Sequence, residues 1–70
     1  MRIRKYYYWC DSGSSYQHYE EATYAENVNQ AISLFRDSYF KRYGNYPFEV
    51  LTRRVNKATA EDINRESDFE

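Results

Sequence analysis

The amino-acid sequence predicts an α+β domain with the order strand, strand, helix, strand (ββαβ). Three observations predict it: two tyrosine-rich segments flank a short Asp-Ser-Gly-Ser segment, a stretch with helical periodicity follows, and a short run rich in Val, Leu and Thr comes after it. A helical crossover lays the third strand beside the first. We therefore expect a three-stranded antiparallel or mixed sheet of order 2-1-3, with one helix packed on one face.

The two tyrosine-rich segments, Arg2–Cys10 and Tyr16–Ala25, have the composition of paired strands. A tight turn at Ser12-Gly13, or a longer loop from Asp11 to Ser14, would pair residue i with residue 25 minus i. This register joins two opposite charge pairs and two aromatic pairs across the hairpin. The expected pairs are Lys5 with Glu20, Arg4 with Glu21, Tyr6 with Tyr19, and Trp9 with Tyr16.

Because side chains alternate along a strand, this hairpin has two distinct faces. We expect the face containing Cys10 and Ala25 to meet the helix, since Cys and small residues are commonly buried. That face comprises Arg4, Tyr6, Tyr8, Cys10, Gln17, Tyr19, Glu21, Thr23 and Ala25. The opposite face comprises Ile3, Lys5, Tyr7, Trp9, Tyr16, His18, Glu20, Ala22 and Tyr24.

The helix is predicted from about Val28 to Tyr43, with Asn27 as N-cap, Gln30 reaching back, and Gly44 ending it. Leu34 and Phe40 lie on the flanks of the apolar stripe, where each edges the core or reaches a partner. The stripe itself consists of Val28, Ala31, Ile32, Phe35, Tyr39 and Tyr43.

The third strand is predicted over Phe48–Val55, after a turn at Asn45-Tyr46-Pro47. Residues 1–57 then form the domain, and residues 58–70 form an acidic tail that is a short helix or disordered. A cap-like pattern begins at Thr59, but little apolar surface follows it, so we expect a frayed tail. Such a tail leaves the second face of the sheet uncovered.

Aromatic residues dominate this composition: nine Tyr, four Phe and one Trp stand against eight Ile, Leu and Val residues in total. Tyrosine carries a large apolar ring with a polar end and is favoured at recognition surfaces. Because one helix shields one face of a sheet, an exposed aromatic sheet face is expected. Such a face favours a small interaction protein.

Charge does not favour a strong nucleic-acid binder. Residues 1–57 hold nine Lys or Arg against six Asp or Glu, and residues 58–70 hold one against five. A mildly basic body falls short of the concentrated basic stripe that is typical of nucleic-acid binding.

No constellation of residues indicates catalysis, a metal or a cofactor. Cys10 and His18 fall on opposite faces in the expected register, and Glu20 and Glu21 point to opposite sides of their strand. A single cysteine provides neither an internal disulfide nor a multi-thiolate site. We therefore expect a non-enzymatic, cytoplasmic protein, without a signal peptide or membrane span.

The partner that these features favour is a host protein or a protein–nucleic-acid complex. Alternatives are a single-strand nucleic-acid binder, with rings such as Trp9 stacking on bases, and a homodimer buried on the aromatic face. The basic residues in the nucleic-acid alternative are Arg2, Arg4, Lys5, Arg53 and Arg54. The candidate partner-binding residues are Lys5, Tyr7, Trp9, Tyr16, His18, Glu20, Tyr24, Leu34 and Phe40.

The segment Tyr24–Ile32, which follows a tyrosine-rich hairpin, together with Tyr43–Pro47, resembles small ββαβ proteins encoded by phages and other mobile elements. Those proteins include anti-CRISPR inhibitors, so the resemblance implies an inhibitor of a host defence nuclease complex. The hairpin-then-helix order is also similar to the HicB-type antitoxin domain, which would imply a toxin blocker. This chain lacks the Pro-Asp-Leu-Pro-Gly segment of that domain.

Overall fold

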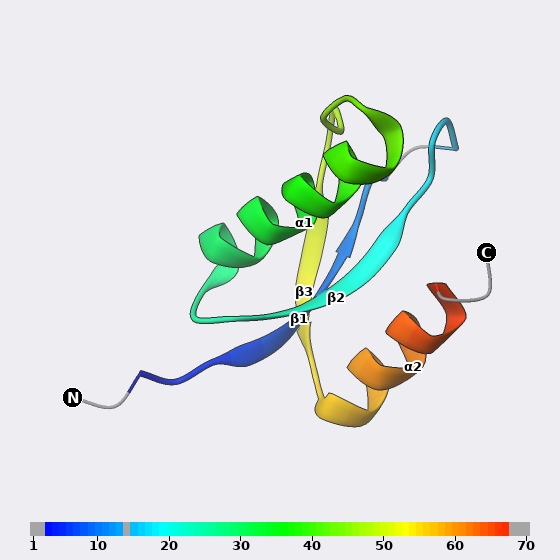
Figure 1. The fold of residues 1–70 in the computed structure, drawn as a ribbon. Helices are drawn as coiled ribbons and strands as arrows, with labels where there is room; N and C mark the ends of the chain where they lie inside the picture. Colours follow the sequence, from blue (N-terminus) through cyan, green and yellow to red (C-terminus); the bar gives the residue numbers. More distant parts are fainter. Residues whose placement is uncertain (1–2, 14, 68–70) are drawn as a thin grey trace.

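A computed structural model describes residues 3–13 and 15–67, and Figure 1 shows the arrangement of its three strands and two helices. The expected positions Arg2, Ser14 and 68–70 lie outside the described residues. The elements are β1 (Tyr6–Asp11), β2 (Glu20–Ala25), α1 (Val28–Tyr43), β3 (Leu51–Val55) and α2 (Lys57–Ser67).

The three strands form one sheet of order β2-β1-β3, in which β1 is antiparallel to both neighbours. The predicted ββαβ order and sheet order are confirmed. The predicted hairpin register is wrong, because Tyr6 pairs with Ala25 and Asp11 with Glu20. The strands are therefore displaced by six residues from the expected pairing. Because six is even, the displacement leaves the paired residues of β1 and β2 on their predicted faces, whereas Tyr16, Gln17 and His18 lie in the loop between the strands.

A long loop replaces the expected two-residue turn, and hydrogen bonds hold it. Ser12 and Tyr19 continue the strand register: the Ser12 N–H donates to the Tyr19 carbonyl at 3.1 Å, and the Ser12 hydroxyl accepts from the Tyr19 N–H at 3.1 Å. Gly13 and Gln17 both adopt positive φ values, of 71° and 52°. The Gln17 amide oxygen accepts from the Tyr39 hydroxyl at 3.2 Å, which ties the loop to α1.

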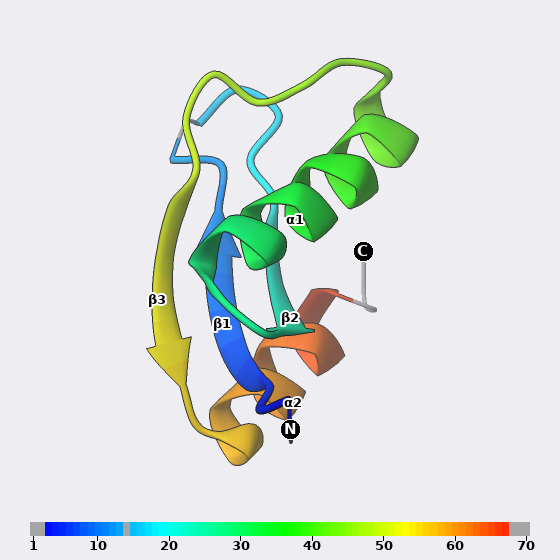
Figure 2. The ribbon, with the colours of Figure 1, turned by 90° about the vertical axis from the view of Figure 1, so that its left-hand side faces the viewer.

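One face of the sheet packs against α1, as Figure 2 shows, and we name it the α1 face. The expectation that Cys10 and Ala25 face the helix is confirmed, because both are fully buried there against Phe35 of α1. The centre of the Tyr19 ring lies 5.7 Å from that of the Phe35 ring. Because the chain has few aliphatic side chains, tyrosine rings supply much of the apolar area of this core. The cluster consists of Tyr8, Cys10, Ala25, Ala31, Phe35 and Tyr39, with Tyr6, Tyr19, Tyr43 and Val50 at its margin.

Helix α1 has the predicted ends. The Asn27 side chain accepts from the Gln30 N–H at 2.8 Å, and the Gln30 side chain accepts from the Glu26 N–H at 2.7 Å. At the other end Gly44 has a left-handed φ of 80° and its N–H donates to the Phe40 carbonyl. Side chains therefore cap the N-terminus of α1, and a backbone N–H caps its C-terminus.

Strand β3 is shorter than predicted, since it begins at Leu51 and not at Phe48. Residues 44–50 form a loop from the end of α1 to the sheet, so Phe48 belongs to no strand and its side chain is fully exposed.

The expected frayed tail is wrong for the described residues, because Lys57–Ser67 form helix α2. The helix begins at Lys57, and Asn56 caps it three residues before the predicted cap Thr59: the Asn56 side chain accepts from the Thr59 N–H at 2.8 Å. Ala60 of α2 and Ala22 of β2 are both buried, with 1% and 8% of their surface exposed. Two small residues let helix and strand approach closely, which compensates for the few large apolar side chains.

Helix α2 packs on the face opposite α1, which we name the α2 face, and Figure 1 shows the sheet between the two helices. The prediction that this face has no cover is therefore wrong. Asn64 of α2 also closes the outer edge of β2: its Oδ1 accepts from the Ala22 N–H at 2.9 Å, and its Nδ2 donates to the Ala22 carbonyl at 3.1 Å. The side-chain amide thus replaces a neighbouring strand.

Replacement of Asn64 by Ala removes both hydrogen bonds from Ala22. We expect a loss of about 1–2 kcal/mol in the free energy of unfolding, measured by urea denaturation. The matched control is Asn29→Ala, at an exposed position of α1. Equal stability of the two variants would show that α2 does not hold the strand edge.

Candidate interaction surface

Two loops meet at one end of the molecule, which we name the loop end: residues 12–19 between β1 and β2, and residues 44–50 before β3 (Figure 2). Their contact is close, because a Cβ placed on Gly13 would lie 3.3 Å from Cδ of Glu49. Helix α1 supports this end, since the Tyr43 hydroxyl donates to the His18 carbonyl at 3.1 Å. The loop end is therefore anchored to the core.

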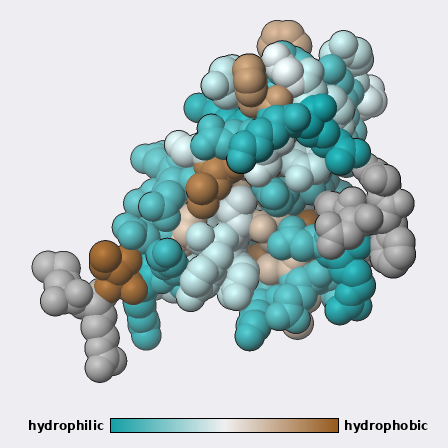
Figure 3. Space-filling model, in the orientation of Figure 1, coloured by the Kyte–Doolittle hydropathy of each residue, from teal (hydrophilic) through white to brown (hydrophobic). Residues whose placement is uncertain are grey.

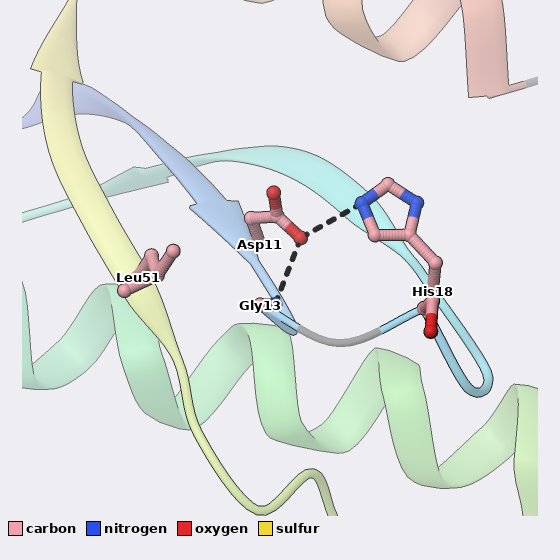
Figure 4. Close-up of a pocket in the computed structure, with 5 residues that line it drawn as sticks. Asp11, Gly13, His18 and Leu51 are labelled. Atoms are coloured by element: carbon pink, nitrogen blue, oxygen red, sulfur yellow. Dashed lines mark hydrogen bonds and ion pairs between the residues drawn. The ribbon is translucent and has the colours of Figure 1, made fainter.

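A shallow open pocket of about 570 Å³ lies at the loop end. Figure 4 shows Asp11 and His18 facing each other across it, with Nε2 of His18 3.0 Å from Oδ1 of Asp11. The same carboxylate oxygen accepts from the Gly13 N–H at 3.0 Å, so it orders the first turn of the loop. The pocket is lined by Asp11, Gly13, Ser15, His18 and Leu51.

This geometry gives Asp11 a structural role. Both contacts of its carboxylate go to the loop that it begins, and the His18 side chain remains 49% exposed. The His–Asp pair thus fixes the start and the end of the loop at the wall of an open pocket.

The most exposed large apolar side chains of the loop end come from both of its loops. Phe48 is 100% exposed, Tyr16 70% and Tyr46 59%. Leu51 adds a 43% exposed side chain at the pocket wall. Figure 3 shows hydrophobic atoms as separate spots among hydrophilic ones, including spots at the top of the molecule. These exposed side chains make the loop end the candidate interaction surface.

On the α2 face, Trp9 is the centre of an ordered polar and aromatic cluster. Its indole N–H donates to Oε1 of Glu20 at 2.9 Å, and the Arg53 guanidinium lies 5.2 Å from its ring centre. The three residues come from three different strands. Trp9 itself is partly buried, so the prediction of a broadly exposed aromatic face is wrong at its centre.

Tyr7, Tyr24 and Lys5 form a second group on the α2 face. The Tyr7 and Tyr24 rings, paired across β1 and β2, lie 4.6 Å apart, and the Lys5 ammonium lies 5.9 Å from the Tyr24 ring. Tyr24 is 53% exposed and Tyr7 is partly buried. The predicted pair of Lys5 with Glu20 does not form, since Glu20 is opposite Asp11.

The remaining predicted contact residues lie on α1. Leu34 and Phe40 are 42% and 44% exposed, and the Phe40 ring packs 4.8 Å from Tyr46 of the following loop. Phe40 thereby adjoins the loop end, whereas Leu34 lies earlier along the helix. The nine predicted residues therefore do not form one site.

Sequence reasoning missed Tyr46 and Phe48. Phe48 was placed inside a strand because Phe, Val and Leu follow one another closely from this position. The signal against a strand was local: Gly44 ends the helix, and Pro47 immediately precedes Phe48. A loop continuing through Phe48 is consistent with both residues.

The Cys10 thiol and the Glu21 carboxyl are two ionisable groups on the α1 face of the sheet. Burial raises the pKa of the Cys10 thiol, which lies 3.7 Å from the Thr52 hydroxyl, so the thiol is held in its unreactive form. Burial also raises the pKa of the Glu21 carboxyl, and hydrogen bonds from Ser38 and Tyr19 partly oppose that effect. Cys10 belongs to the core cluster, and the half-buried Glu21 lies beside it, opposite Cys10 in the pairing of β1 with β2.

Among residues 3–13 and 15–67, no three His, Cys, Asp or Glu side chains are placed to hold a metal ion. Neither described helix has the length and apolar character needed to cross a bilayer. Comparison of the chain with protein-family models, with curated proteins and with solved structures gave no match.

Replacement of Glu21 by Gln should alter how stability depends on pH. A carboxyl whose pKa is raised by folding stabilises the protein at low pH, and this contribution is lost as pH rises from the ordinary value of 4.5 through the folded-state pKa. We therefore expect Glu21→Gln to raise the melting temperature at pH 8 more than at pH 4.

Thermal melts across that pH range provide the measurement, with Glu61→Gln at an exposed position of α2 as control. A stability difference between Glu21→Gln and the parent chain that stays constant with pH would contradict burial of the carboxyl.

Proposed function

We propose that this protein is a non-catalytic binding module that docks on another protein through its loop end. The observation that carries the proposal is the exposure of Phe48, Tyr16 and Tyr46 on two adjoining loops, the first of which α1 holds through the hydrogen bond from Tyr43 to His18. Aromatic side chains on a supported surface bury large areas on binding at low entropic cost.

The shallow pocket beside these rings supports the same proposal. It offers an apolar wall at Leu51 and a charged pair at Asp11 and His18. An apolar anchor with nearby polar groups that fix orientation is the usual organisation of a protein-binding surface.

The charges near the aromatic residues favour a protein partner over a nucleic acid. Arg53 lies over Trp9, which alone would suit base stacking, but Glu20 accepts a hydrogen bond from the same indole. Asp11 adds a second carboxylate on this face. Carboxylates among the stacking rings would repel phosphates, whereas a protein surface of mixed charge would complement them.

The resemblance to small proteins of mobile elements supports a more specific proposal about the partner of this module. We propose that it acts as an inhibitor that occupies a surface of a host defence nuclease complex. Inhibition by occupation requires no catalytic group, only an anchored contact surface.

Replacement of Phe48 by Ser should reduce capture of a host partner on an affinity resin by about tenfold or more, since a central aromatic anchor contributes about 2 kcal/mol or more. Because Phe48 is fully exposed, the stability of the domain should not change. The control is Ile3→Ser, which is 69% exposed and precedes β1, away from the loop end.

Capture is measured from host lysate with and without nuclease treatment. A partner that is retained after digestion and lost with Phe48→Ser supports the proposal. Loss of all binding on digestion would instead favour the nucleic-acid alternative, with stacking at Trp9.

A further inference from the structure

The two outer edges of the sheet differ in whether another element covers their backbone groups. The outer edge of β2 is closed, because Asn64 satisfies both backbone groups of Ala22. The outer edge of β3 has no such cover: within residues 3–13 and 15–67, no hydrogen bond reaches it from another element. An open strand edge is a template for pairing with another strand.

The backbone groups that face this open edge follow from the alternation of antiparallel pairs. Because Ala22 directs its N–H and C=O away from β1 to Asn64, the opposite residue Trp9 directs its own groups toward β3. Trp9 is opposite Arg53, so the backbone groups of Arg53 point inward. Thr52 and Arg54 therefore present two N–H donors and two C=O acceptors to the outside.

Cations flank these backbone groups on both faces of the sheet. Arg53 lies on the α2 face with its guanidinium 5.2 Å from the Trp9 ring centre, and Arg54 lies on the α1 face 3.6 Å from the Tyr6 ring centre. Both arginines are exposed. Stacking on a ring limits the freedom of a guanidinium while leaving its N–H groups available to a carboxylate.

The charges of Arg53 and Arg54 determine which kind of strand can pair with the open edge. Pairing of β3 with β3 of a second copy would bring four arginines side by side, and like charges across strands are destabilising. A segment with acidic residues on both faces would instead pair with one arginine on each.

We propose that the outer edge of β3 binds an extended acidic segment of a partner protein as a fourth strand of the sheet. Thr52 and Arg54 supply the backbone hydrogen bonds, and the side chains of Arg53 and Arg54 select carboxylates. The inference rests on the proposed function in that the partner is a protein. It adds the chemistry of the segment and the edge that receives it.

The direct test is fluorescence anisotropy with a labelled peptide Thr-Val-Glu-Glu-Val-Thr, in which neighbouring glutamates point to opposite faces of a strand. One control peptide carries Lys-Lys in place of Glu-Glu, and a second keeps the glutamates but replaces both valines by proline. We expect the full-length protein to bind the first peptide at least about tenfold more tightly than either control. Equal binding of the proline peptide would reduce the contact to charge attraction and overturn the inference.

Two variants separate backbone pairing from charge. Thr52→Pro removes an outward N–H and keeps both arginines, and the pair Arg53→Glu with Arg54→Glu keeps the backbone groups. Each should weaken binding of the acidic peptide by about tenfold or more. The matched charge control, Arg36→Glu with Lys41→Glu on exposed positions of α1, should weaken it far less.

Amide hydrogen exchange of the unaltered protein covers the case in which Thr52→Pro fails to fold. Peptide addition should slow exchange at Thr52 and Arg54, while the Arg53 amide should be slow both with and without peptide. Unchanged exchange at Thr52 and Arg54 would overturn the inference. So would a dimer in sedimentation that the arginine-to-glutamate pair strengthens, or binding of an oligothymidylate in preference to the acidic peptide.

The outcome remains distinguishable from a failure of the proposed function. If Phe48→Ser abolishes binding of the host partner and Thr52→Pro leaves it unchanged, the proposed binding function stands and strand addition at β3 is wrong. If the unaltered protein binds neither a host partner nor the acidic peptide, both proposals are wrong.

Discussion

The structure depends on one constraint: a three-stranded sheet with few aliphatic side chains has to be covered on both faces. On the α1 face, Phe35 is the one large side chain among the described residues that is completely buried, and tyrosine rings pack around it. On the α2 face, Ala22 and Ala60 bring a short helix close to the strands. Because a domain of this size has a thin margin of stability, neither layer is dispensable.

The position of α2 determines what remains exposed. By packing beside β2 and satisfying Ala22 through Asn64, it removes one sheet edge and part of one face from solvent. The loop end and the β3 edge stay open, and both proposed contact sites lie there. Tyr39 and Tyr43 hold the loop between β1 and β2 through Gln17 and His18, so these tyrosines also preorganise that part of the loop end.

Sequence reasoning succeeded where the signal was local or periodic. Asn27, Gly44 and the apolar spacing predict α1 to the residue, and the strand alternation predicts that Cys10 and Ala25 meet it. The register of the hairpin failed because Ser12-Gly13 suggested a tight turn, whereas Ser12 pairs with Tyr19 and the core draws the Tyr19 ring onto Phe35. Side-chain parity survived only because the displacement is even.

Helix α2 could not be predicted from apolar content, since its attachment uses the small residue Ala60 and the amide of Asn64. The predicted contact residues are dispersed because the register places Tyr16 and His18 in the loop between β1 and β2, and because Leu34 and Phe40 lie on α1. Tyr46 and Phe48 are exposed because they lie in the loop before β3, which the sequence pattern did not separate from the strand.

Amide hydrogen exchange at Ala22 in the free protein tests the role of α2 most directly. Ala22 lies on an outer strand, where an uncovered N–H exchanges quickly, but the Asn64 side chain accepts its hydrogen bond. Docking of α2 predicts exchange at Ala22 as slow as at the central strand β1. Exchange as fast as at an exposed loop amide would show that α2 does not cover the sheet.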